Sequence, residues 1–300
     1  MISRGVVFTL TNILVVITLS VSIKIFGLSD YIYTSTGYNS LSLLAFFSIW
    51  GFSGSIISLL LSKIIAKRVY KVEIIDNNTE IPELKGIISV VRELSKKAGL
   101  EVSPEVGIYD SEEINAFATG PTKKRSMLAL STKMLSAMSM EQVIAVIAHE
   151  IGHISNGDMV TMTLIQGTVN SFSLFFSRVL SLTLLNYVSS DLRRFLSYFL
   201  SITLDLVFTS IGSVFLAWFS RRREYRADKL SAELYSPDHM IDALQFLKSY
   251  SGRNDKDELT GFTSMKIDNG KGKNSINFLF STHPKLDDRI NSIKKAYNII

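Results

Sequence analysis

Long uncharged apolar runs alternate with polar stretches along this chain of 300 residues. The runs cover residues 5–27, 41–62, 160–188 and 195–220, and their only charged residues are Lys24, Arg178 and Asp205. A helix needs about 20 predominantly apolar residues to cross the hydrocarbon core of a bilayer. The pattern therefore predicts four transmembrane helices, of which the last two form a hairpin around residues 189–194.

The first run could also be a secretory signal peptide, because Arg4 precedes its apolar core. A signal peptide ends in a small-residue cleavage site such as A-x-A. No alanine occurs before Ala45, so the sequence favours a helix that stays in the protein.

Basic residues gather on one side of the predicted spans. They follow the second and the fourth run and are Lys63, Lys67, Arg68, Lys71, Arg221, Arg222, Arg223, Arg226 and Lys229. The segment 28–40 has no Lys or Arg, and Arg193 and Arg194 in the hairpin are too few to reverse the asymmetry. Because cytoplasmic loops carry the excess of Lys and Arg, we expect the long polar segments to face the cytoplasm. We interpret the basic run 221–223 as a membrane-edge anchor.

The polar segments 66–158 and 220–300 are each small, and together they have the size of one typical domain. We therefore expect two N-terminal spans within residues 1–65 and a membrane hairpin at 159–219 that is inserted into one cytoplasmic domain. The expected fold class is α+β, mostly helical, with a small sheet.

Local patterns predict the elements of this domain. Apolar spacing and turn residues indicate helices at 82–99, 140–157 and 285–297, strands at 106–109, 114–119 and 126–131, and a mobile polar loop at 251–275. Ser139 is placed to cap the second of these helices.

Composition excludes several kinds of site. Hydrophobic residues make up 47 % and charged residues 20 %, which is typical of a chain partly solvated by lipid. The chain has no Cys, which excludes disulfide scaffolds, thiol catalysis, iron–sulfur clusters and cysteine zinc sites. The net charge of +5 comes from residues beside apolar runs, which favours an anionic membrane surface over nucleic acid. Any metal must bind to carboxylates and to His149, His153, His239 or His283.

His149, Glu150 and His153 form the pattern H-E-x-x-H on the helix predicted at 140–157. Residues i and i+4 share a helix face, so the two imidazoles can converge on one cation. Glu150 lies about 100° around the helix, where it can flank the metal and take a proton from water. Zinc fits this donor set and keeps an open position in catalytic sites. The alternative is a solvated helix with an incidental His and Glu.

A third ligand must be another histidine or a carboxylate. Glu224 and, one turn later, Asp228 lie on one helix face. With Glu224 as a ligand, Asp228 could accept a hydrogen bond from a ligating imidazole and fix the orientation of its ring. The alternative is that both acids neutralise the basic residues around them.

Four motifs occur in order: I-N-A-F-A-T-G at 114–120, A-H-E-I-G-H at 148–153, S-R-R-R-E-Y-R-A-D at 220–228 and S-T-H-P at 281–284. With the four apolar runs they closely resemble the HtpX-like membrane zinc metalloproteases, relatives of the CAAX prenyl endopeptidases. The resemblance implies a zincin-like domain that holds one Zn²⁺ through His149, His153 and Glu224, with Glu150 as the catalytic base. It also implies stress-related quality control at the cell membrane, with membrane or misfolded proteins as substrates.

The resemblance extends to residues that would contact substrate. Asn115, Ala116, Phe117 and Ala118 look like the family's active-site edge strand, whose backbone would pair with an extended substrate. The alternative is an ordinary buried strand.

His283 and Arg289 stand before and within the predicted C-terminal helix. In related enzymes this region approaches the zinc and can polarise the substrate carbonyl or hold the oxyanion. His283 could instead be a structural cap of the helix, and we interpret His239 as a surface residue.

Two other functions fit the pattern less well. An intramembrane protease would need H-E-x-x-H inside the bilayer, but Asn156 and Asp158 follow too soon for that segment to span. A transporter or scaffold with a structural zinc site would suit Arg178 and Asp205 inside apolar runs, yet a structural site needs a fourth ligand.

Arg178 and Asp205 are equally far from the middle of the predicted hairpin loop, so we expect them to pair. Alternatively, Arg178 snorkels and Asp205 faces a wet cleft.

Overall fold

The computed structural model describes residues 33, 39–76, 78–185, 190–251 and 281–299, with side chains of the last long helix described from residue 196 onward. The first apolar run, nearly all of the segment 28–40, the turn of the hairpin and nearly all of the loop predicted at 251–275 lie outside these residues. The chain divides into two compact units: residues 1–56 with 164–213, and residues 57–163 with 214–300.

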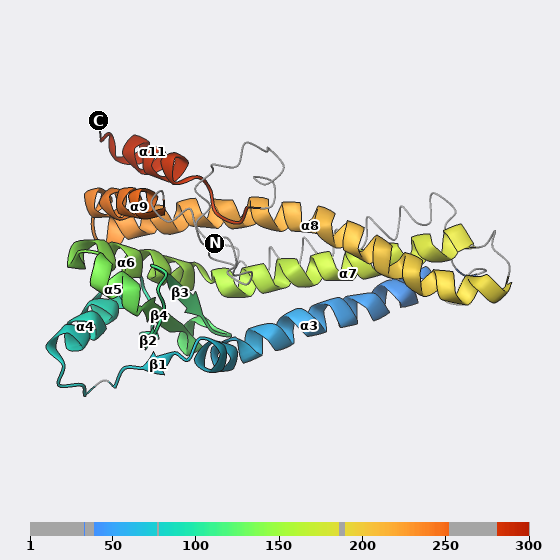
Figure 1. Ribbon diagram of the computed structural model, residues 1–300, viewed down its shortest axis with the longest axis horizontal. Helices are drawn as coiled ribbons and strands as arrows, with labels where there is room; N and C mark the ends of the chain where they lie inside the picture. The colour runs from blue at the N-terminus through green and yellow to red at the C-terminus, as the bar shows by residue number, and fades with distance from the viewer. Residues whose placement is uncertain (1–32, 34–38, 77, 186–189, 252–280, 300) are drawn as a thin grey trace. The chain divides into compact units, whose positions relative to one another are not determined.

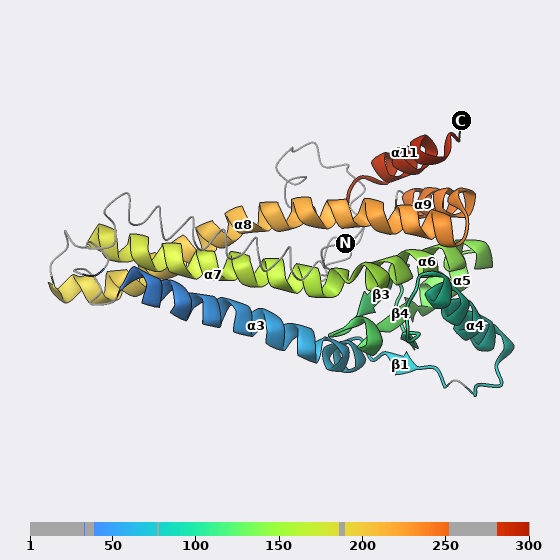
Figure 2. The same cartoon turned by 180° about the vertical axis from the view of Figure 1, so that it is seen from behind.

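Three long helices pass through the first unit, where they run side by side (Figures 1 and 2). They are α3 (Ser40–Val69), α7 (Asp158–Leu185) and α8 (Ser190–Leu234). Of the described helices these three are long and apolar enough to cross a membrane. Their exposed side chains include Ile49, Trp50, Phe199, Ile202 and Ile211, each more than 60 % accessible. Such an apolar outer surface is what contact with lipid tails requires.

Small residues bring the helices of the first unit close together. A Cβ atom added to Gly51 on α3 would lie 2.5 Å from the backbone nitrogen of Ser171 on α7. Helices in membranes associate through such close backbone approaches, because lipid supplies no hydrophobic force between them.

Asp205 on α8 bonds to Ser173 on α7, whose Oγ lies 2.5 Å from Asp205 Oδ1 and 2.9 Å from Thr209 Oγ1. Among the described side chains no ion pair joins Arg178 to Asp205, so the expected pair does not form. The reason is the register of the hairpin. The contacts of Ser173 with Asp205 and of Ser181 with Ser197 both centre on residue 189, a few positions before the predicted middle of the loop.

A small mixed sheet forms one layer of the second unit. Its strands are β1 (Glu73–Ile74), β2 (Glu105–Tyr109), β3 (Ala116–Thr119) and β4 (Met127–Ser131), in the order β1-β2-β4-β3. Strands β2 and β4 are parallel and the other pairs are antiparallel. β4 is buried throughout because it has a neighbour on each side and a core on each face, whereas β3 lies at an edge.

The helix α6 (Met140–Asn156) lies at the centre of the second unit, between the sheet and the helix α9 (Figure 1). The surrounding helices are α4 (Pro82–Lys97), α5 (Thr132–Ala137), α9 (Pro237–Ser251) and α11 (Leu286–Tyr297), with a short 3-10 helix at Lys123–Arg125. As predicted, Ser139 caps α6, and its hydroxyl and Gln142 form a reciprocal capping box. Gly157 ends α6 in the left-handed conformation at φ 66°, so α7 begins at once with Asp158.

Candidate active site

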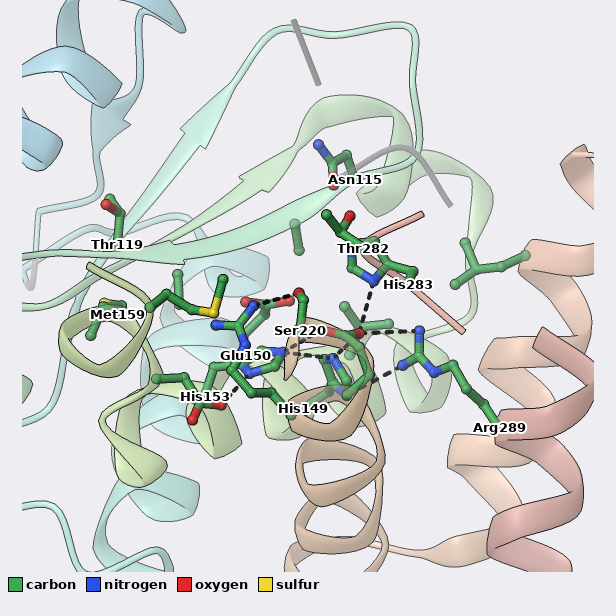
Figure 3. Close-up of a pocket in the computed structure, with 18 of the residues that line it drawn as sticks. Asn115, Thr119, His149, Glu150, His153, Met159, Ser220, Thr282, His283 and Arg289 are labelled. Carbon is green, nitrogen blue, oxygen red and sulfur yellow. Dashed lines mark hydrogen bonds and ion pairs between the residues drawn. The ribbon is translucent and has the colours of Figure 1, made fainter. Parts of the chain in front are cut away.

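Helices α6 and α8 bring His149, His153 and Glu224 together. Figure 3 shows the two histidines beside each other. His149 Nε2 lies 3.2 Å from His153 Nε2, and Glu224 carboxylate oxygens lie 3.5 Å and 3.3 Å from these two nitrogens. Ligand atoms about 2.0–2.1 Å from a tetrahedral zinc ion are roughly 3.3–3.4 Å from one another. The three side chains therefore already have the spacing of a tetrahedral metal site.

Each imidazole is held by a carboxylate on the side away from the proposed metal position. Asp228 Oδ1 lies 2.9 Å from His149 Nδ1, and Asp158 Oδ2 lies 2.8 Å from His153 Nδ1. Both Nε2 atoms are thereby left to face Glu224. Such partners fix the tautomer and raise the basicity of metal ligands. The sequence pointed to Asp228 but not to Asp158, whose signal was its place directly after the glycine that ends the H-E-x-x-H helix.

Buried carboxylates make this cluster attract positive charge. Burial acts to lower the pKa of His153, but Asp158 and Glu224 outweigh it and raise the pKa to about 10. For His149, burial likewise acts downward, and Asp228 and Glu224 shift the pKa upward overall. A buried cluster rich in carboxylates that favours cations is well suited to a divalent metal ion.

Arg289 on α11 completes the cluster. Its Nε and Nη2 atoms lie 2.8 Å and 2.6 Å from the two oxygens of Asp228, and the side chain is nearly fully buried. Burial acts to lower its pKa, but Asp228 and Glu224 raise it overall, so the guanidinium stays charged. Arg289 thus holds Asp228, which in turn holds His149.

Glu150 and the edge strand face one cavity beside this cluster (Figure 3). The cavity has a volume of about 400 Å³. Glu150 is 7 % exposed, and its Oε2 has no hydrogen-bond partner. Burial raises the pKa of this carboxyl. A buried carboxylate with a free oxygen beside a metal site is placed to hold and accept a proton from water.

The predicted edge strand lines the same cavity in part. Asn115, Ala116 and Ala118 line it, as does Thr119. Phe117 points to the other face of the sheet, where its ring packs 5.5 Å from that of Tyr109. The alternation of side chains along a strand accounts for the opposite placement of Phe117 and its neighbours Ala116 and Ala118.

Residues 83–297 of the chain match peptidase family M48. The chain is 42 % identical to "Protease HtpX homolog" of Bacillus subtilis over 300 residues, which cover 98 % of this chain and 99 % of the relative. It is 41 % identical to "Protease HtpX" of Wigglesworthia glossinidia brevipalpis over 299 residues, or 97 % of each chain. The chain belongs to peptidase family M48. It is a membrane-associated metalloprotease, and the resemblance seen in the motifs is confirmed.

A solved structure shares the fold of this M48 peptidase. The crystal structure of S. mikatae Ste24p superposes with a TM-score of 0.61 at 18 % identity, over 96 % of this chain and 67 % of that chain. The mostly helical architecture with a small sheet is thus confirmed.

The C-terminal residues of the M48 peptidase reach the same site. His283 lines the cavity, and its Nδ1 lies 2.9 Å from Glu224 Oε2. Lys285, not His283, occupies the N-cap of α11, so the alternative of a structural cap is wrong. His239 stacks on Tyr235, with ring centroids 5.0 Å apart, and is not among the residues that line this cavity.

The three arginines before Glu224 have three different environments. Arg222 lies 4.5 Å over the ring of Trp218, a contact that suits a membrane edge. Arg221 donates a hydrogen bond of 2.6 Å to the carbonyl of Ser281. Arg223, however, lines the cavity with Ser220. The interpretation of the whole run as an anchor is therefore wrong for Arg223, because the helical twist turns this residue toward the site.

Proposed function

We propose that this M48 peptidase is a zinc-dependent endopeptidase whose site consists of His149, His153, Glu224 and Glu150. One observation carries the proposal. The three potential ligands have the spacing of a zinc site, and they border a cavity that also holds Glu150 and the free edge of β3. Three protein ligands leave a position open, as catalytic zinc requires.

The chain's own groups account for the remaining chemistry. Bound zinc would supply Lewis acidity that activates water and polarises the scissile carbonyl. Glu150 takes the proton from the attacking water and passes it to the leaving amine. Asp228 and Asp158 keep the imidazoles in the orientation that binding needs.

Substrate binding follows from the place of β3 at the edge of the sheet. An extended peptide adds to this edge as another strand, with backbone hydrogen bonds to residues 115–119. His283 faces the cavity and donates a hydrogen bond to the oxyanion that forms at the scissile carbonyl. Arg289 is a positioning residue, because its guanidinium is bound to Asp228.

The apolar helices and the positions of basic residues support the location of the enzyme. We infer a multi-pass protein of the cell membrane with its catalytic unit in the cytoplasm, since Lys and Arg follow the second and fourth apolar runs. Membrane or misfolded proteins are the substrates that an enzyme so placed would meet. A transporter or scaffold with a structural zinc site has less support, because the described residues group three ligands, not four.

Digestion of an unfolded membrane protein tests this proposal. The detergent-purified enzyme should cleave it, lose activity in a chelator and recover with added Zn²⁺. Cleavage that persists after the chelator has removed all bound metal would refute metal-dependent catalysis.

A further inference from the structure

Arg223 is a cation that lines the catalytic cavity, and no described carboxylate forms an ion pair with it. Its Nη2 donates a hydrogen bond of 3.0 Å to Ser220 Oγ, and its Nε is buried with no partner. Among the described residues no ion pair includes Arg223, although acidic residues line the same cavity. An arginine that cannot lose its proton and lacks a partner in a partly buried site favours an anion beside it.

The acidic residues of this cavity are already engaged elsewhere. Glu224 faces the two imidazoles, Asp158 holds His153, and Glu150 is needed as the proton acceptor. Arg289, the other arginine of the cavity lining, is bound to Asp228. Arg223 is therefore the arginine of this lining that is free to bind a ligand.

Arg223 lies close to the place where the scissile bond of a bound peptide would be. Ser220, Arg223 and Glu224 lie three and four residues apart, so they share one face of α8. Thr119 at the end of the edge strand and Met159 line the cavity with them (Figure 3). A peptide added along β3 would advance about 3.3–3.6 Å per residue. A group bound by Arg223, next to the ligand Glu224, therefore belongs to a substrate residue close to the bond that is cleaved.

We propose that Arg223 forms an anionic subsite that binds a carboxylate of the peptide substrate near the scissile bond. The guanidinium offers planar paired donors that match a carboxylate. Two parts of a peptide carry this group: an Asp or Glu side chain and the C-terminal carboxylate. The inference rests on the proposed proteolytic function and adds a specificity to it.

The test is a cleavage profile of a peptide library, read by mass spectrometry, with amidated and free C-termini compared. Among the peptides that the wild-type enzyme cleaves, Asp and Glu should be enriched at one fixed position near the cleaved bond. If the C-terminal carboxylate is the ligand, cleavage instead occurs at a fixed distance from the C-terminus and disappears on amidation. The kcat/KM of a carboxylate peptide relative to its neutral analogue should fall about 10–100-fold in Arg223→Gln, mainly through KM.

Three further variants make the test specific. Arg223→Lys keeps the charge and should keep part of the preference, and Arg223→Glu should favour Lys or Arg at the same position. Arg222→Gln, which lies over Trp218 and not in the cavity lining, should retain the wild-type profile. A wild-type profile without carboxylate preference, or an unchanged ratio in Arg223→Gln and Arg223→Glu, would overturn the inference alone. If wild-type enzyme cleaves no peptide or protein, the proposed function itself fails. If Arg223→Gln does not fold, the wild-type profile and the Arg223→Lys variant still decide.

Discussion

Asp228 and Asp158 hold the imidazoles of His149 and His153, the two proposed metal ligands, in the same way, but their surroundings differ. Asp228 also carries two hydrogen bonds from Arg289, which is 4 % exposed. Asp158 has Arg226 as its other basic neighbour at 3.5 Å, and that side chain is 45 % exposed. We therefore expect Asp228→Asn and Asp158→Asn to weaken metal binding alike, by about 10–100-fold, and to differ in stability.

The difference in stability follows from the buried charge that each variant leaves behind. In Asp228→Asn the buried Arg289 guanidinium loses the carboxylate that binds it through two hydrogen bonds and keeps the more distant Glu224 at 3.5 Å. Because it cannot release its proton, the change costs about 3–5 kcal/mol. In Asp158→Asn the exposed Arg226 returns to water, which costs about 0–1 kcal/mol. The histidine in either variant can lose its proton. The free energies of unfolding should therefore differ by at least about 2 kcal/mol, or roughly 4–8 °C in melting temperature for a unit of this size.

Thermal unfolding of the metal-free proteins in detergent with a chelator measures this difference without a contribution from metal binding. The double variant Asp228→Asn with Arg289→Gln is the control, because it removes the buried charge that has lost its bidentate partner and should recover part of the lost stability. Equal melting temperatures of the two single variants, or no recovery in the double variant, would refute the role given to Arg289.

Three further changes have defined outcomes. Glu224→Gln should reduce the zinc that remains bound after dialysis more than either aspartate variant, because it removes a proposed anionic ligand. Retention of the wild-type zinc content would reject the assignment of Glu224 as a ligand. Gly120→Ala should lower the free energy of unfolding by at least about 2 kcal/mol more than Gly99→Ala. Both glycines have positive φ, but a Cβ atom would meet the backbone of residues 125–126 only at Gly120. Equal chemical-denaturation midpoints of the two variants would contradict this. Gly51→Val should lower the melting temperature in detergent far more than Gly54→Val, whose added Cβ meets nothing within 4 Å, and similar melting of both would disprove the close approach of α3 and α7.

Most features predicted correctly from the sequence came from the spacing of residues within one helix or strand. The i, i+4 spacing of His149 and His153 fixed their common face, and the residues between turns at 114–119 predicted a strand, which the structure has at Ala116–Thr119. These features depend only on local helix and strand geometry, so they can be predicted from a single sequence. Glu224 could be named as a ligand because the motif at 220–228 resembles that of the HtpX-like metalloproteases, since the 27 acidic residues of the chain leave many other candidates.

Features that depend on the register between elements were not predictable. Asp158 reaches His153 because α6 ends and α7 begins within one residue at Gly157. Asp205 meets Ser173 because the hairpin centres a few residues earlier than the charge pattern indicated. Arg223 looked like one of several surface charges, and only the rotation of α8 turns it toward the cavity.

Glu150→Gln isolates the proposed proton transfer from metal binding, because it changes the proposed proton acceptor and none of the proposed ligands. The amide is nearly isosteric and uncharged, so the fold and the metal content should match those of the wild type. Cleavage of an unfolded membrane protein by the zinc-loaded variant, with zinc and protein quantified in the same sample, is the measurement. We expect wild-type zinc content with cleavage slowed about 10²–10⁴-fold. Cleavage at the wild-type rate by the zinc-loaded variant would contradict this expectation.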